Sequence, residues 1–129
     1  MDINWIGIIA ATISAFVLGG IWYGPLFGKR WQSLVGLSDE QVKNANMAKV
    51  FGGAFVLTLI AAFVFAMFLG PDITIQQGTA YGASAGLCWV GAALGINYLF
   101  AQRPLALWLI DTGYMTLMFT LFGALLGAL

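Results

Sequence analysis

The sequence contains no histidine, and this absence narrows the chemistry open to the chain. Histidine is the commonest general base and the commonest protein metal ligand, so no serine, cysteine or threonine here has a histidine to activate it. No group of Cys, Asp and Glu has the spacing of a metal site, and no glycine run has the form of a phosphate-binding loop. We therefore expect no enzyme activity, no catalytic residue, no metal and no cofactor.

Charged residues are scarce as well. They make up 8% of the 129 residues against 61% hydrophobic residues, which leaves too little polar surface to coat a water-soluble globule. Five Lys and Arg balance five Asp and Glu, so no basic field attracts nucleic acid. The single cysteine, Cys88, cannot form an intrachain disulfide. The composition predicts one domain over residues 1–129 whose partner is the lipid bilayer and not a nucleic acid.

Four long apolar blocks take up most of the chain, with proline-containing connections after the first, second and third. About 20 residues, at about 1.5 Å of helix each, cross a hydrocarbon core of about 30 Å. We therefore predict an all-α integral membrane protein whose four transmembrane helices pack as a small bundle. The predicted spans are residues 3–23, 50–69, 78–100 and 105–127.

The connection after the first span contains a clear helix start. Ser38, followed by Gln41, has the pattern of a capping box, in which each side chain satisfies a free amide of the first turn. No proline follows until the end of the second span, so we predict one helix over residues 39–69. Its first turns, residues 39–49, are expected to form an amphipathic extension on the cytoplasmic side.

The first helix is expected to end at Gly24 and Pro25. Proline has no amide hydrogen and fixes its own backbone angle, so a helix rarely continues past such a pair. Residues 26–37 then connect this helix to the next helix start.

The orientation follows from the basic residues near the ends of the spans, which are enriched on the cytoplasmic side. The first connection and the third contain all of them, whereas the second connection and both termini contain none. Both basic connections are therefore predicted to be cytoplasmic, with both termini outside. These residues are Lys29, Arg30, Lys43, Lys49 and Arg103.

Small residues dominate the third span, which we interpret as the central post of the bundle. Helices in lipid associate through close van der Waals packing, which small residues permit. Two stripes of small residues follow the helical repeat, and the second either serves another chain or is used within the monomer. The predicted packing glycines are Gly78, Gly82, Gly86, Gly91 and Gly95, and the second stripe comprises Ser84, Cys88, Gly91 and Gly95.

Asp111 is the one charged residue inside the fourth span. An ionised side chain at such a position costs about 3 kcal/mol on insertion scales, so it usually faces other helices and finds partners. Two interpretations remain open: Asp111 fixes the helix register through hydrogen bonds, or it accepts protons or attracts cations in a pathway. The candidate partners within the membrane are Asn97, Tyr98, Tyr114, Thr58 and Trp89.

A short repeat links the first and third spans. Gly20-Ile21-Trp22-Tyr23 resembles Gly95-Ile96-Asn97-Tyr98, and both segments precede a basic connection. We hypothesise that the chain consists of two related helical hairpins in parallel orientation.

Four motifs together carry a resemblance to a known family. In their order and spacing they resemble the small bacterial membrane proteins classed as domain of unknown function 1761. The resemblance implies a four-helix protein of the cytoplasmic membrane and no established activity or substrate. The motifs are Trp22-Tyr23-Gly24-Pro25-Leu26-Phe27-Gly28-Lys29, Asn46-Met47-Ala48-Lys49, Leu94-Gly95-Ile96-Asn97-Tyr98-Leu99-Phe100 and Leu109-Ile110-Asp111-Thr112-Gly113-Tyr114.

Two roles from different classes are consistent with these features. The first is association, either with itself as a homo-oligomer or as an accessory subunit of a larger membrane complex. The alternative is a small transporter or proton-linked channel with a path around Asp111. A flux that depends on the carboxyl group distinguishes them.

Overall fold

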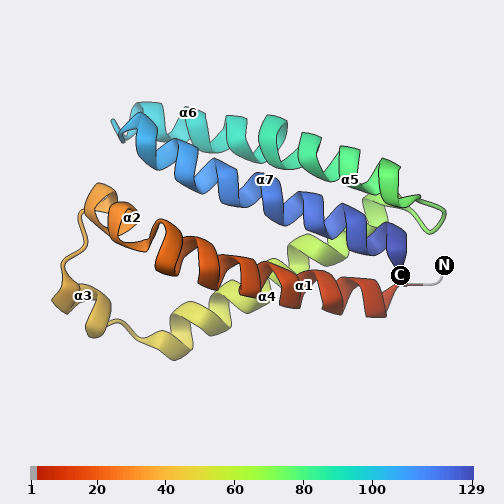
Figure 1. The fold of residues 1–129 in the computed structure, drawn as a ribbon, viewed down its shortest axis with the longest axis horizontal. Helices are drawn as coiled ribbons and strands as arrows, with labels where there is room; N and C mark the ends of the chain where they lie inside the picture. Colours follow the sequence, from red (N-terminus) through yellow and green to blue (C-terminus); the bar gives the residue numbers. More distant parts are fainter. Residues whose placement is uncertain (1–2) are drawn as a thin grey trace.

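Residues 3–129 are described by a computed structural model, and helices account for most of this part of the chain (Figure 1). Four helical segments are long and apolar enough to cross a membrane, which confirms the predicted all-helical class and the number of such segments. These are α1 (Trp5–Ile21) with the π-helical turn η1 (Trp22–Leu26); α4 (Met47–Leu69); α5 (Ile75–Ser84), the π-helical segment η2 (Ala85–Gly91) and α6 (Ala92–Phe100); and α7 (Leu105–Ala128).

The prediction of one helix over residues 39–69, with 39–49 as its extension, is wrong. The capping box at Ser38 and Gln41 is present, but the helix that it starts, α3 (Asp39–Lys43), is short. A new helix, α4, begins after Asn46, whose side-chain oxygen accepts the amide of Lys49 at 3.2 Å. Asparagine favours such caps over helix interiors because its side chain competes for backbone amides.

The predicted end of the first helix at Gly24 and Pro25 is also wrong. The helical segment continues through both residues in the wider turn of η1, where the amide of Phe27 donates to the carbonyl of Trp22 at 2.9 Å. A π-turn widens the helix locally and so accommodates the residue that has no amide hydrogen.

A short helix, α2 (Gly28–Val35), follows directly, where the sequence analysis expected a plain connection. Its first residue is a glycine because a Cβ there would lie 2.5 Å from the carbonyl oxygen of Tyr23. The helix ends at Gly36, whose φ of 80° lies in the left-handed region that glycine adopts without strain.

The helix at the centre of the fold is α7, and the interpretation of the third span as the central post is wrong. Figure 1 shows α7 between α1 on one side and the segment from α5 to α6 on the other. In the apolar stretch of α7, 39% of the residues are buried, compared with 17% in the apolar stretch of the third segment. Glycines allow one close neighbour, whereas large side chains such as Phe122 and Leu107 fill the space between several helices.

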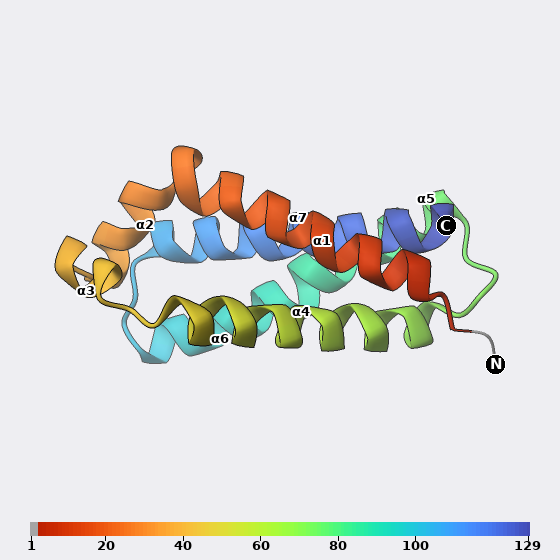
Figure 2. The ribbon, with the colours of Figure 1, turned by 90° about the horizontal axis from the view of Figure 1, so that it is seen from below.

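The apolar core lies toward the end of the molecule where α1 begins and α7 ends (Figure 1). There, Ala11 of α1 and Phe65 of α4 pack with Phe122 of α7. Figure 2 shows α1 and α4 close together at this end and diverging toward α2 and α3. The polar side chains discussed next lie in the diverging half.

Candidate functional site

The third segment and α7 touch along their backbones. A Cβ on Gly78 would overlap the carbonyl oxygen of Gly123, and a Cβ on Gly82 would overlap that of Phe119. At Gly86 it would lie 2.6 Å from the Cα of Thr116. These three glycines therefore face α7, and no larger residue fits without moving a helix.

The π-helical segment η2 keeps the next two predicted glycines on the same side. Gly91 follows Gly86 after five residues. In an α-helix, two residues at this spacing point in different directions, but the wider π-helical turn places both on the face toward α7. A Cβ on Gly91 would lie 2.6 Å from Cγ2 of Thr112, and a Cβ on Gly95 would lie 3.0 Å from Nε1 of Trp108. Both glycines of the expected second stripe are thus used inside the chain.

Asp111 is buried between three helical segments, with 8% of its surface exposed. The hydroxyl of Tyr23, on η1, donates to its Oδ1 at 2.7 Å, and the hydroxyl of Tyr98, on α6, donates to its Oδ2 at 2.5 Å. Hydrogen bonds to a carboxylate are stronger than bonds between neutral groups. The carboxyl group therefore ties the first and third segments to α7.

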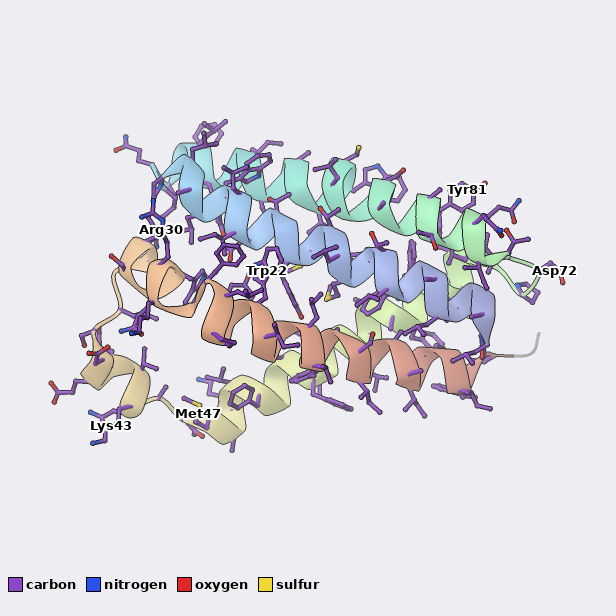
Figure 3. All side chains as sticks on the ribbon, in the orientation of Figure 1. Trp22, Arg30, Lys43, Met47, Asp72 and Tyr81 are labelled. Carbon is purple, nitrogen blue, oxygen red and sulfur yellow. The ribbon has the colours of Figure 1, made fainter. Side chains whose placement is uncertain are left out.

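Further aromatic side chains surround this pair of bonds. Trp22 lies between η1 and α7, where its Nε1 donates to the carbonyl of Ile110 at 2.9 Å (Figure 3). The hydroxyl of Tyr114 donates to the carbonyl of Ala15 at 2.9 Å, and its ring lies 5.2 Å from that of Tyr23. We call Asp111, Tyr23, Tyr98 and Tyr114 the aspartate–tyrosine cluster.

The structure brings together two of the predicted partners of Asp111 and separates the others. Tyr98 and Tyr114 belong to the cluster, whereas Asn97 is exposed on α6 and Trp89 is 64% exposed, with its ring 5.8 Å from that of Phe68. Thr58 returns its hydroxyl to the carbonyl of Ala54 at 2.7 Å. These three residues are not part of the cluster.

The sequence analysis missed Tyr23 and Trp22 as partners of α7. Both lie at the end of a predicted span, where aromatic rings are common, so their positions gave no sign of a contact with α7. The short repeat carried the missing signal, because it aligns Tyr23 with Tyr98, and these two residues bind the two oxygens of Asp111.

A groove of about 430 Å³ lies beside the cluster, where α1 and α4 diverge. Tyr23 and Tyr114 belong to both the cluster and the groove wall, and the rest of the wall is almost entirely apolar. We call this the α1–α4 groove. Its lining residues are Ala15, Phe16, Gly19, Gly20, Tyr23, Gly24, Val50, Phe51, Ala54, Thr58 and Tyr114.

The basic residue nearest to Asp111 along the chain is used elsewhere. Arg103 donates from Nη1 to the carbonyl of Val35 at 3.4 Å, so it joins the third connection to the end of α2. Within residues 3–129, no group of three or more Cys, Asp or Glu side chains is placed to hold a metal ion. The polar centre of the site is therefore the carboxyl group of Asp111, which accepts hydrogen bonds from the hydroxyls of Tyr23 and Tyr98.

Comparison with known proteins gives a family and no activity. The family described as "protein of unknown function (DUF1761)" matches residues 6–127, nearly the whole chain, and confirms the resemblance found in the motifs. No curated protein matches the chain. No solved structure matches it either.

Proposed function

The chain belongs to the DUF1761 family, and from that premise we propose that it acts by association within a bacterial cytoplasmic membrane. In this proposal it is a non-enzymatic multi-pass protein whose four segments span the bilayer as a bundle. It assembles with copies of itself or serves as an accessory subunit of a larger membrane complex.

The distribution of charge supports the orientation in this proposal. Lys29 and Arg30 lie on α2, Lys43 lies on α3, and Lys49 lies in the first turn of α4. Arg103 contacts the end of α2, so it lies at the same end of the molecule. Basic residues gather on the cytoplasmic side of membrane proteins, which supports placing both termini outside.

The observation that carries the association proposal is a second groove, between α4 and the third segment. Its volume is about 280 Å³, and Ser84 and Cys88 line it from the third segment. Both residues belong to the second small-residue stripe, and both are exposed. Small residues beside a groove allow a helix of another chain to approach closely. The other lining residues are Phe65, Phe68, Tyr81, Ala85 and Trp89.

Cysteine cross-linking in lipid nanodiscs tests this proposal directly, because Cys88 is the only cysteine. If two copies meet across the second groove, a short bismaleimide cross-linker is expected to convert most of the protein into a covalent dimer. The native mass before cross-linking is expected to be that of an oligomer, or of a complex with a stoichiometric companion protein.

The matched control moves the cysteine to another exposed position. The double variant Cys88→Ala and Ile13→Cys keeps one cysteine but places it on α1, where Ile13 is 54% exposed. It is expected to stay uncross-linked while keeping the native mass of the wild type. A monomer with no companion would overturn the proposal, and equal cross-linking at both positions would show random collision.

One observation favours the transporter alternative. Tyr23 contacts the α1–α4 groove and also donates to Asp111, so it lies between an open surface and a buried carboxyl group. Such a residue lies where a proton path from the groove to the carboxyl group would pass.

This alternative predicts a proton flux in proteoliposomes that disappears in Asp111→Asn. Asparagine keeps the size of the side chain but neither gains nor loses a proton near neutral pH. A pH-sensitive dye inside the vesicles measures the flux. Protein-free vesicles provide the background, and the variant must elute from a gel-filtration column as the wild type does. Equal flux in both proteins, or none in the wild type, would leave Asp111 without a transport role.

A further inference from the structure

From the α1–α4 groove and the charge at its end, we infer that the chain holds one anionic phospholipid, with an acyl chain in the groove. The inference rests on the proposed membrane location but not on oligomerisation. Three features of the groove carry it: its chemistry, its length and its electrostatic surroundings.

The groove exists because glycines lie where the two helices diverge. Gly20 and Gly24 have open space where a Cβ would be, since no heavy atom lies within 4 Å of that position. Opposite them, Val50 and Ala54 line the groove from α4. The volume of about 430 Å³ falls in the range of roughly 300 to 1,000 Å³ that is typical of ligand pockets.

The polar side chains of the groove already donate hydrogen bonds within the chain. The hydroxyls of Tyr23 and Tyr114 donate to Asp111 and to the carbonyl of Ala15, and Thr58 bonds to the carbonyl of Ala54. The other side chains of the wall are apolar, which suits a hydrocarbon chain.

The length of the groove matches one leaflet of a bilayer. On the first segment it extends from Ala15 to Gly24, which is roughly 14 Å of helix at about 1.5 Å per residue. Half of a hydrocarbon core is roughly 15 Å. One acyl chain of the leaflet on the α2 and α3 side therefore fits along it.

The end of the groove toward α2 and α3 is positively charged. Lys49 directly precedes Val50, the first groove residue of α4, and Figure 3 shows Arg30 and Lys43 at the same end as Met47. With Lys29 of α2, these are four cations on α2, α3 and α4, while Arg103 of the third connection donates to the carbonyl of Val35.

Two acidic residues of α3, Asp39 and Glu40, offset part of this positive charge. Asp39 already accepts a hydrogen bond from Gln32 at 2.7 Å. Each basic residue near a membrane surface attracts anionic lipid by about 1 kcal/mol. The excess of cations therefore selects an anionic headgroup over a zwitterionic one.

Native mass spectrometry of the detergent-purified protein, incubated with phosphatidylglycerol or phosphatidylcholine, tests the inference. The wild type is expected to retain one phosphatidylglycerol and to prefer it over phosphatidylcholine. Gly20→Leu fills the groove and is expected to lower the retained phosphatidylglycerol about tenfold, since about 1.4 kcal/mol of lost contact has that effect. Ala54→Phe fills it from α4 and is expected to act in the same way.

Gly53→Leu is the matched control, because Gly53 also has open space around its Cβ position but does not line the groove. It is expected to retain the lipid as the wild type does. Lys49→Gln is expected to reduce the preference for phosphatidylglycerol, and Arg103→Gln, at the third connection, is expected to leave it unchanged.

Several results would overturn the inference. The first is that Gly20→Leu and Gly53→Leu retain equal amounts of phosphatidylglycerol, and the second is that the wild type retains both lipids equally. The third is that the wild type retains no lipid. The fourth is that Gly20→Leu removes a bound second copy of the chain and not a lipid. Thermal unfolding of each variant separates a filled groove from a misfolded protein. The cross-linking at Cys88 is independent of all these results, so the association proposal can fail while this one holds.

Discussion

Replacing Asp111 with alanine is expected to lower the free energy of unfolding by about 3 kcal/mol, because two hydrogen bonds to a carboxylate are lost. The change also leaves the hydroxyl of the half-buried Tyr23 without its acceptor. Unfolding in mixed micelles with increasing sodium dodecyl sulfate, followed by tryptophan fluorescence, measures the effect.

Conservative variants identify the source of this loss. Tyr23→Phe and Tyr98→Phe each remove one donor, so each is expected to cost about half as much as Asp111→Ala. In the background of Asp111→Ala, either tyrosine change is expected to be nearly neutral, because its acceptor is already absent. If Asp111→Ala unfolds at the wild-type detergent fraction, the cluster does not hold the helices together.

Gly123→Ala is expected to destabilise the protein by about 2 to 3 kcal/mol, the usual cost of adding a methyl group where none fits. The added Cβ would overlap the carbonyl oxygen of Gly78. A backbone atom cannot rotate aside as a flexible side chain can, so α5 and α7 must separate along their contact. The same unfolding experiment measures the change.

Gly53→Ala provides the control for that prediction. It makes the same substitution in a long apolar helix, but no heavy atom lies within 4 Å of its Cβ position. It is expected to be neutral or to stabilise by up to about 1 kcal/mol, since alanine favours a helix over glycine. Equal losses in both variants would show that helix propensity, and not the contact between α5 and α7, determines the result.

The long segments could be predicted from the sequence because their signal is local. Apolar length identified four helices, and the pattern at Ser38 identified the start of α3. The four-residue steps from Gly78 to Gly86 marked a helix face that packs closely, and these glycines do face α7. The partner helix could not be predicted, because a glycine stripe carries no information about which neighbour uses it.

The candidate site depended on contacts between distant residues. Tyr23 and Asp111 are 88 residues apart, and no periodicity relates them. The Gly-Pro pair indicated a helix end, whereas the π-turn carries the helix onward and places Trp22 and Tyr23 against α7. Two hydrogen bonds from that turn outweigh the local preference to stop, and only tertiary structure supplies them.

The central position of α7 has a consequence for biogenesis. On the proposed topology, α7 is the last of the four spans to leave the ribosome, so the first three spans enter the bilayer before the helix on which they pack is made. Asn4 donates to the carbonyl of Leu126 at 3.4 Å, which joins the beginning of the chain to its final turns. On the same topology, a nascent chain interrupted before α7 therefore contains three spans without the α7 part of the core, which consists of Met118, Phe122 and Leu126.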